Sequence, residues 1–160
     1  MIVHPIPPVY DRDSKILILG SFPSVRSREE AFFYGHPQNR FWKVLSTVYG
    51  CVVPVTTEEK KCFLLEHGIA LWDVIASCDI VGSADSSIRN AVPNDLDRIL
   101  QEANIRKIYL NGKTTERIFN KYQRDQTAVE AVCLPSTSPA NAAWSLERLA
   151  EQWSCIRDDN

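Results

Sequence analysis

The chain has 160 residues, of which 44% are hydrophobic and 24% charged, and its formal net charge is −2. This composition is ordinary for a soluble globular protein, and the length predicts a single domain over residues 1–160 with a sizeable core. The charge argues against a protein held tightly on nucleic acid by bulk electrostatics, although local cations and helix N-termini can still hold a few phosphates.

No apolar run approaches the roughly 18 residues of a membrane span, and the N-terminus lacks a secretory signal. We therefore expect a cytoplasmic protein without a membrane partner. Cysteines stand at positions 51, 62, 78, 133 and 155, with no CxxC spacing. This pattern predicts reduced, mostly buried thiols, and neither a metal site nor a cofactor.

Predicted strands and helices alternate along the chain. Apolar runs, periodicity and end signals predict, in order, a strand at 15–21, helices at 40–50 and 57–67, a strand at 69–75, a helix at 92–104, a strand at 105–112, a helix at 114–123, a strand within 127–139 that runs into a loop, and a final helix at 140–156. This order predicts an α/β protein with three α-β-α layers around a central, mainly parallel, four-stranded sheet.

Polar motifs follow three of the predicted strands, and ligands of parallel sheets bind beyond the carboxyl ends of strands. The motifs are "GSFPS" (20–24), "LNGK" (110–113) and "LPSTSPAN" (134–141). Ser21 could be a nucleophile, but the flanks are not GxSxG and no base can be assigned, so an esterase is only an alternative. Asn111 offers one acceptor and two donors to a base edge, although Asn-Gly is also an ordinary turn.

The "LPSTSPAN" segment combines three hydroxyls with a helix that we expect to start at Ala140–Asn141. Free N–H groups at such a start, with the hydroxyls, would form a phosphate cradle, and an N-capping loop is the alternative. Residues 82–90, with Asp85 and Arg89, are expected to be a solvated loop. Charged side chains at 113 and 117 are expected to be solvated as well.

Four ordered motifs, "GSFPS", "YGHPQNRFWKVL", "LNGK" and "LPSTSPAN", together resemble the uracil-DNA glycosylase superfamily over residues 14 to 153. The segment "HPQNRFWKV" is similar to the mismatch-specific uracil/thymine glycosylases. The first and last motifs resemble more closely the branch that removes hypoxanthine from deoxyinosine in DNA. The resemblance implies a base-excision enzyme that acts on double-stranded DNA containing a deaminated base, and we expect a monomer.

Two positions depart from the usual superfamily pattern. Phe22 stands where most members carry Asp or Asn to position water, and Leu134 stands where many carry His or Asn to hold the leaving base. The hypoxanthine branch resembles this chain in that respect, and in it an asparagine equivalent to Asn39 takes the catalytic role. The resemblance therefore implies hypoxanthine as the substrate base, ahead of uracil, and Asn39 as the catalytic residue.

A base held outside the helix needs a pocket and a filler for the gap that it leaves. In the pocket, Tyr34 and Phe22 are expected to sandwich the purine, Asn111 to bond its edge, and His36 to donate to a purine nitrogen or to fix its own loop. The loop residues expected at the DNA are Ser136 and Ser138 for flanking phosphates, and Pro139, Ala140 or Asn141 for the vacated space. Phe41 and Trp42 are expected to anchor the helix at 40–50.

A neutral amide such as that of Asn39 can only orient water, which suffices if the glycosidic bond breaks largely before attack. No lysine is evidently placed as a Schiff-base nucleophile, so a monofunctional enzyme is expected. The alternatives are a mismatch-specific uracil-DNA glycosylase, an inactive relative that only binds damaged DNA, and the esterase using Ser21.

Overall fold

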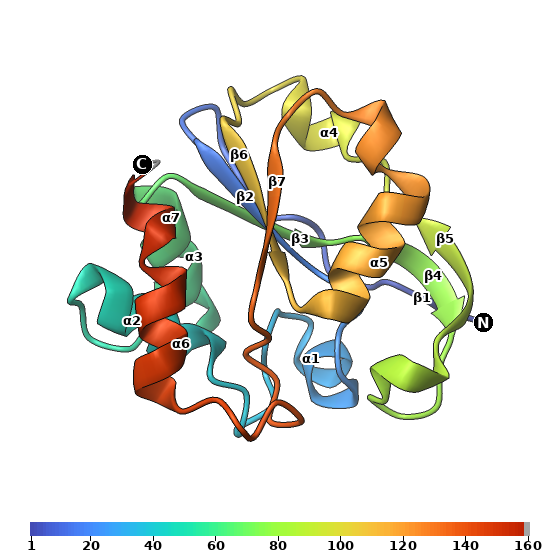
Figure 1. Ribbon diagram of the computed structural model, residues 1–160, viewed down its shortest axis with the longest axis horizontal. Coiled ribbons are helices and arrows are strands. Elements are labelled where there is room, and N and C mark those ends of the chain that lie inside the picture. Colours follow the sequence, from blue (N-terminus) through green and yellow to red (C-terminus); the bar gives the residue numbers. More distant parts are fainter. Residues whose placement is uncertain (159–160) are drawn as a thin grey trace.

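The computed structural model describes residues 1–158 (Figure 1). Its strands are β1 (Ile2–Val3), β2 (Ile16–Gly20), β3 (Ile69–Asp73), β4 (Ile75–Asp79), β5 (Arg89–Pro93), β6 (Lys107–Asn111) and β7 (Ala131–Leu134). Its α-helices are α1 (Val25–Glu30), α2 (Phe41–Tyr49), α3 (Thr57–Glu66), α4 (Asp97–Leu100), α5 (Lys113–Tyr122), α6 (Leu146–Trp153) and α7 (Cys155–Asp158), with short 3-10 turns at Asp85–Ser87 and Arg124–Gln126.

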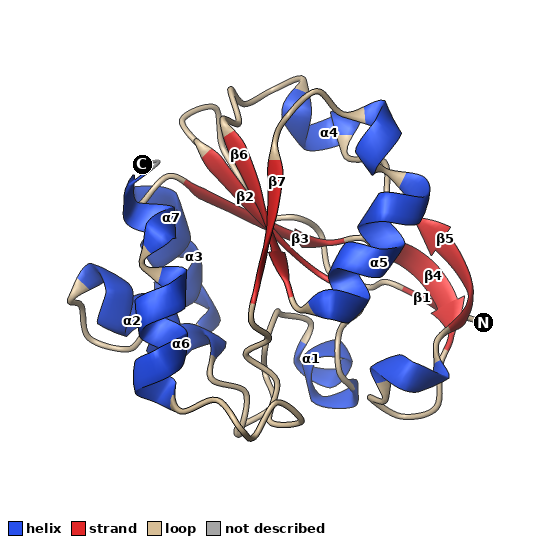
Figure 2. Cartoon of the chain, in the orientation of Figure 1, coloured by secondary structure: helices blue, strands red, loops and turns tan. Residues whose placement is uncertain are grey.

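The central sheet has four parallel strands in the order β3-β2-β6-β7. Helices α2, α3, α6 and α7 cover one face and α4 and α5 the other, so the predicted three-layer α/β fold is confirmed (Figure 1). All five residues of β2 are buried, as expected for a strand covered on both faces. The carboxyl ends of the strands meet the loops that follow β2, β6 and β7 at the lower edge in Figure 2.

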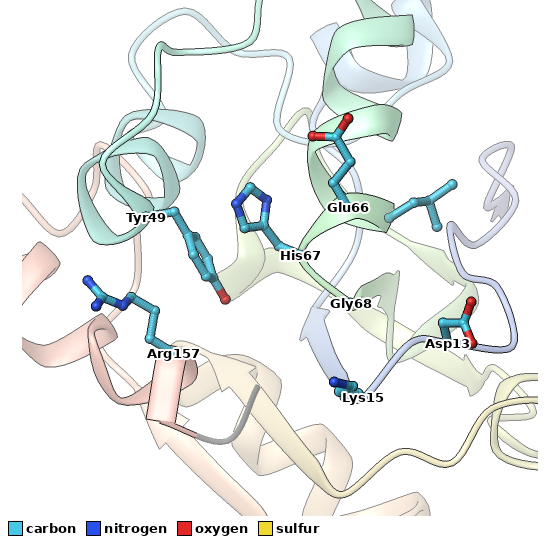
Figure 3. A pocket seen from close by; sticks show the side chains of 8 residues that line it. Asp13, Lys15, Tyr49, Glu66, His67, Gly68 and Arg157 are labelled. Atoms are coloured by element: carbon cyan, nitrogen blue, oxygen red, sulfur yellow. The ribbon is translucent and has the colours of Figure 1, made fainter.

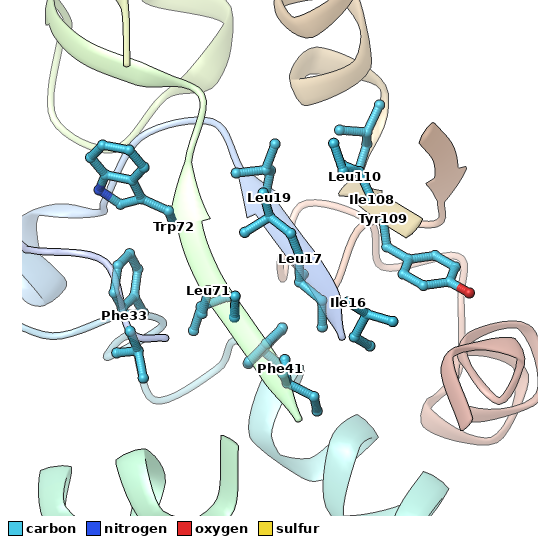
Figure 4. Close-up of a cluster of buried hydrophobic side chains, with 14 of the residues drawn as sticks. Ile16, Leu17, Leu19, Phe33, Phe41, Leu71, Trp72, Ile108, Tyr109 and Leu110 are labelled. Carbon is cyan, nitrogen blue, oxygen red and sulfur yellow. The ribbon is translucent and has the colours of Figure 1, made fainter. Parts of the chain in front are cut away.

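Side chains of the sheet and helices share one core, part of which is shown in Figure 4. Leu17 and Leu19 extend from β2 and Leu71 from the neighbouring β3, and Phe41 joins the same core from the start of α2. Phe41 is fully buried and makes an edge-on contact with Trp153 of α6, at 6.1 Å between ring centroids. The predicted role of Phe41 and Trp42 as anchors of this helix is therefore confirmed.

A second sheet was missed by the sequence analysis. It has three antiparallel strands in the order β1-β4-β5, and β4 starts directly after β3. The prediction of one strand at 69–75 was wrong at its end, because the chain turns after Asp73 and starts β4 at Ile75. The amide of Asn94 holds this turn by donating to the carbonyls of both residues, at 2.9 and 3.1 Å.

The helix predicted at 92–104 was wrong over its first part. Residues 89–93 pair with β4, and the helical stretch is limited to α4. Pro93 is extended, as the last residue of β5, and strand pairing therefore outweighs the apolar periodicity on which the prediction depended.

The final helix starts later than predicted. The side chain of Ser145 accepts a hydrogen bond from the Arg148 N–H and caps α6, so Ala140 and Asn141 belong to a loop. The cradle at an Ala140–Asn141 helix start is therefore not formed, and residues 135–145 are a long excursion after β7.

The N-terminal segment closes the outer edge of the central sheet. Val9 forms an antiparallel bridge with Leu71 of β3, with N–H to O distances of 3.0 and 2.9 Å. This covered edge cannot pair with another chain at that point. The pairing also brings the first residues of the chain to the carboxyl end of β3, beside the loops described below.

No helix in the described part of the chain is long and apolar enough to cross a membrane. The cysteines at 51, 62, 78, 133 and 155 are all free thiols, as predicted. The prediction that most are buried was wrong, because Cys51 and Cys62 are exposed and, of the five, Cys78 alone is fully buried.

Candidate functional site

A large cleft opens at the carboxyl ends of the parallel strands. Its volume is about 1130 Å³, and its walls come from the loops after β2, β6 and β7 and from the turn at Asp85–Ser87. A smaller pocket of about 470 Å³ lies near Lys15 and Gly68, at the amino ends of β2 and β3 (Figure 3). Ligands of parallel sheets bind at the carboxyl edge, so the larger cleft is the candidate site.

Hydrogen bonds link three elements in one wall of the cleft. Asn111, the last residue of β6, donates from Nδ2 to the Tyr34 hydroxyl at 3.2 Å and to Thr137 Oγ1 at 3.1 Å. Its Oδ1 accepts from the Thr137 backbone N–H at 3.1 Å. Thr137 is fully buried and donates from Oγ1 to Asn39 Oδ1 at 2.9 Å. The wall is therefore pre-organised before any ligand binds.

This network determines how Asn39 faces the cleft. Its Oδ1 accepts from Thr137 and also from the Phe41 backbone N–H, at 3.0 Å, which is the first N–H of α2. A backbone N–H can only donate, so the amide is oriented with oxygen inward and nitrogen outward. Asn39 Nδ2 has no hydrogen-bond partner among the described residues. The group that the cleft receives from Asn39 is thus a pair of N–H donors.

The network also limits Asn111. The two hydrogens of its Nδ2 are engaged with Tyr34 and Thr137 in the free protein. Direct bonding of Asn111 to a base edge stays a prediction, and it would require one of these bonds to be exchanged for one to the base.

Tyr34 lies on the cleft wall with its ring stacked on Phe41, at 3.9 Å between centroids and 16° between planes. Its backbone has φ of 53°, which is uncommon for a residue with a side chain. Burial, followed by the charge of Asp73, raises the pKa of the Tyr34 hydroxyl well above its ordinary value. Tyr34 therefore presents a neutral hydroxyl and one ring face on which a flat base can stack.

The structure places Phe22 and His36 at the same cleft. Phe22 is mostly buried, with its ring edge-on to His4 at 5.7 Å. His36 accepts from the Gln38 N–H at Nδ1, at 3.1 Å. A neutral imidazole that accepts at Nδ1 carries its proton on Nε2. The predicted hydrogen bond from His36 to a purine nitrogen requires this Nε2–H as its donor.

The loop after β7 is held by its own polar side chains. The hydroxyls of Ser136 and Ser138 accept from the Ser138 and Ala140 N–H groups, both at 3.1 Å. Neither hydroxyl hydrogen has an acceptor in the described part of the chain, so both can donate to a phosphate. Asn141 donates from Nδ2 to the Ser136 carbonyl at 2.9 Å and is turned into the loop, whereas Ala140 is exposed and Pro139 half-buried.

Arg40 is a residue of this loop system that sequence reasoning missed. Its guanidinium donates to the carbonyls of Trp144, Ser138 (3.2 Å) and Asn141 (3.0 Å). Its backbone N–H donates to the Thr137 carbonyl at 3.1 Å. One side chain next to Asn39 therefore fixes the shape of a loop about a hundred residues away in sequence, which no local pattern indicates.

Ser21 does not form a catalytic triad in the structure. Its Oγ donates to Asp85 Oδ2 at 3.0 Å, and it has no hydrogen bond to a histidine among the described residues. The expectation that Asp85 is solvated was wrong, because it lines the cleft and is half-buried. Burial raises the pKa of its carboxyl above the ordinary value. The geometry gives no support to an esterase.

Two further charged groups lie at the cleft, of which Asp73 was not singled out from the sequence. Asp73 ends β3 and is hydrogen-bonded to His4 at 2.8 Å. In the sequence, Asp73 appears as a charged residue inside an apolar run. Because the strand was expected to continue to residue 75, the sequence did not indicate that Asp73 ends it. Lys113 lines the rim of the cleft and is exposed, as expected for a solvated charge.

We expect Gly20→Ala to impair the site. A Cβ at Gly20 would lie 2.6 Å from Asp73 Oδ1 and 2.8 Å from the Tyr34 hydroxyl oxygen, so both groups would have to move. Overpacking of this kind costs about 1–3 kcal/mol of unfolding free energy, and we expect kcat/KM to fall at least about tenfold. Urea unfolding and the kinetics of the reaction proposed below measure the two effects.

Gly50→Ala is the matched control for this prediction. Gly50 has φ of 66°, but a Cβ there meets no atom within 4 Å. This variant should lose stability, by about 1 kcal/mol, and keep its activity. Equal activity losses in the two variants would show that Gly20 has no special part in the site.

Comparisons with known proteins identify the family of the chain. The family model "Uracil DNA glycosylase superfamily" matches residues 7–158. A protein of Methanosarcina acetivorans named hypoxanthine DNA glycosylase is 34% identical over 158 residues, which are 98% of each chain. One of the same name from Methanosarcina barkeri is 33% identical over 109 residues, 67% of this chain and 69% of the relative.

A solved structure is similar over nearly the whole chain. It is a solution NMR structure of a protein from Methanosarcina acetivorans, described as a candidate uracil DNA glycosylase, with 32% identity, a TM-score of 0.84 and coverage of 99% of both chains. With a family model that matches almost all of its length and relatives above 30% identity, the chain belongs to the uracil DNA glycosylase superfamily.

Proposed function

We propose that this protein removes hypoxanthine from deoxyinosine in double-stranded DNA by hydrolysing the bond between base and sugar. The observation that carries the proposal is the wall made by Tyr34, Asn111, Thr137 and Asn39, which combines a stacking ring with outward amide donors at the carboxyl edge of the sheet. The relatives named hypoxanthine DNA glycosylase support the choice of base.

The extruded purine enters the cleft and stacks on the outer face of Tyr34, with Phe22 on its other side. Stacking of a base on an aromatic side chain contributes about 1–3 kcal/mol. Unstacking from the duplex costs a few kcal/mol, less at a mispair such as I·T, so the two terms are comparable. Hypoxanthine carries an acceptor at O6 where adenine carries an amino group. The N–H donors of the wall can bond to O6 but not to the amino group, so they favour hypoxanthine.

Catalysis is proposed to depend on donors and on placement. Asn39 Nδ2 donates to the oxygen of the attacking water or to the developing negative charge on the base. His36 donates from Nε2 to a ring nitrogen of the purine. A sugar cation that forms as the base departs needs only a well-placed water, so a neutral amide is sufficient.

The loop at 135–145 is proposed to enter the duplex. Ser136 and Ser138 donate their hydroxyl hydrogens to phosphates beside the lesion. Pro139 and Ala140 fill the space that the base vacates, and Asn141 supports them from within the loop through its bond to the Ser136 carbonyl.

The test is a panel of duplexes that contain deoxyinosine, uracil or xanthine, each incubated with the protein and then heated in alkali to cut at abasic sites. The proposal predicts cutting at deoxyinosine, fastest opposite thymine. Absence of cutting at every base would refute it, and tight binding to deoxyinosine duplexes without base release would identify a relative that binds damage only.

A second candidate is a mismatch-specific uracil-DNA glycosylase. It is favoured by the segment "HPQNRFWKV" and by the description of the similar solved structure. Relative rates on G·U and I·T duplexes separate the two, because a mismatch-specific uracil enzyme would act faster on G·U.

We further propose that the enzyme is a monomer and monofunctional. Lys113 is exposed at the cleft rim and has no described role in the wall, so an imine with the sugar is not expected. Borohydride added during turnover of a deoxyinosine duplex should therefore trap no covalent adduct. An adduct that disappears in Lys113→Ala would contradict the monofunctional mechanism.

A further inference from the structure

Asp73 is a buried carboxylate at the floor of the cleft. It is 4% exposed, ends β3 and lies among the residues that line the cleft. Its Oδ2 is 2.8 Å from Nε2 of His4, which is brought there by the N-terminal segment along the sheet edge. No lysine or arginine in the described part of the chain forms an ion pair with it.

The protonation state of His4 follows from its second nitrogen. Nδ1 accepts the backbone N–H of Ile6 at 3.1 Å, so it carries a lone pair, and the ring is neutral with its proton on Nε2. His4 therefore donates to Asp73 without neutralising its charge. The ring is itself fixed, because it is buried and in edge-on contact with Phe22 at 5.7 Å.

The second oxygen of Asp73 is turned to the cleft. No hydrogen bond reaches Oδ1 from any described residue. A Cβ placed on Gly20 would lie 2.6 Å from Asp73 Oδ1 and 2.8 Å from the Tyr34 hydroxyl oxygen. Both oxygens therefore lie close to the same point above this glycine. A buried charge without a cationic partner costs stability, so this carboxylate is not explained by folding. It is an acceptor that awaits a donor from a ligand.

We propose that Asp73 Oδ1 accepts the ring N–H that deamination creates, and that His4 is the positioning residue that fixes this oxygen. This proposal rests on the proposed function, in which the ring N–H bound by Asp73 is N1–H of hypoxanthine. Adenine has a lone pair at N1, which the carboxylate repels, and cytosine differs from uracil in the same way at N3. Guanine also carries an N1–H, so its exclusion depends on other contacts.

Asp73→Asn tests the inference by reversing the polarity of the contact. His4 Nε2–H still needs an acceptor, so it takes the amide oxygen of the new side chain and leaves the NH2 group facing the base. We expect kcat/KM for hypoxanthine to fall about 100-fold. The ratio of kcat/KM for hypoxanthine to kcat/KM for mispaired adenine should fall by at least the same factor.

Asp79→Asn is the matched control. Asp79 is on the neighbouring strand β4, pairs with the N-terminal amine at 3.2 Å and does not line the cleft. It makes the same change in net charge and should keep both the rate and the preference. An unchanged preference in folded Asp73→Asn would overturn the inference, whereas an inactive wild-type protein would refute the proposed function instead.

A change in the substrate tests the same contact without any variant of Asp73. In 1-methyldeoxyinosine the N1–H is replaced by a methyl group, and the wild-type protein should release this base at least about 100-fold more slowly than hypoxanthine. Asp73→Ala, which removes the acceptor and makes room, should abolish that preference. Equal release of the two bases by the wild-type protein would overturn the inference.

Discussion

Asn39→Ala should lower kcat for hypoxanthine release by about 100- to 1000-fold, the usual effect of removing one donor from a pre-organised site. The amide is held with Oδ1 on Thr137 and on the Phe41 N–H, so its Nδ2 is the part that reaches the cleft. Affinity for a deoxyinosine duplex should change little, because the binding loop and the stacking ring remain. Single-turnover rates and binding by fluorescence anisotropy separate these effects.

Asn39→Asp distinguishes two roles for this residue. A carboxylate still accepts from Thr137 and from Phe41 N–H, so the start of α2 is preserved, but it offers no donor to the cleft. If Asn39 acts by donating, this variant should be as impaired as Asn39→Ala. Near-normal or higher activity would show that an acceptor that activates water is what the reaction needs.

Arg40→Ala should weaken binding of a deoxyinosine duplex at least about tenfold and lower the unfolding free energy by about 2 kcal/mol. The guanidinium holds the carbonyls of Ser138, Asn141 and Trp144, so its loss frees the loop at 135–145 and leaves part of its ordering to be completed at the DNA. The effect should appear mainly in affinity. Anisotropy titration and urea unfolding measure it.

Two variants check the origin of this effect. Arg26→Ala removes an exposed arginine that pairs with Glu30 on α1, so it controls for the loss of one positive charge. Arg40→Lys keeps the charge, but one ammonium cannot serve three carbonyls in the same way. We expect Arg26→Ala to bind the deoxyinosine duplex with near-normal affinity and Arg40→Lys to bind it more weakly. Wild-type affinity in Arg40→Lys would mean that charge, and not loop geometry, sets the binding.

The layers of the fold could be predicted because they depend on local patterns. The run "ILIL" before Gly20 has no polar residue, which suits a strand covered on both faces, and the heavily apolar "FWKVLSTVY" ends at a glycine with φ of 66°. The second sheet could not be predicted in this way. Strands β4 and β5 are partly exposed and irregular in register, and β4 pairs with the first residues of the chain.

The same distinction applies to the site. Asn39, Tyr34 and Asn111 were indicated by motifs, and the structure brings them together through Thr137, a residue that appears in the sequence only as one hydroxyl among three. The His4–Asp73 pair spans 69 residues and the contacts from Arg40 to the loop about 100, so both depend on tertiary packing. The motifs indicated which side chains face the cleft, but not which atoms of each side chain point into it.

The most direct measurement is the amount of free hypoxanthine released from an I·T duplex by excess wild-type protein, determined by mass spectrometry. The account predicts one equivalent of free base for each duplex, with the sugar–phosphate strand left intact until alkali is added. Recovery of the duplex with its base still attached, under conditions in which the protein is bound to it, would contradict the account.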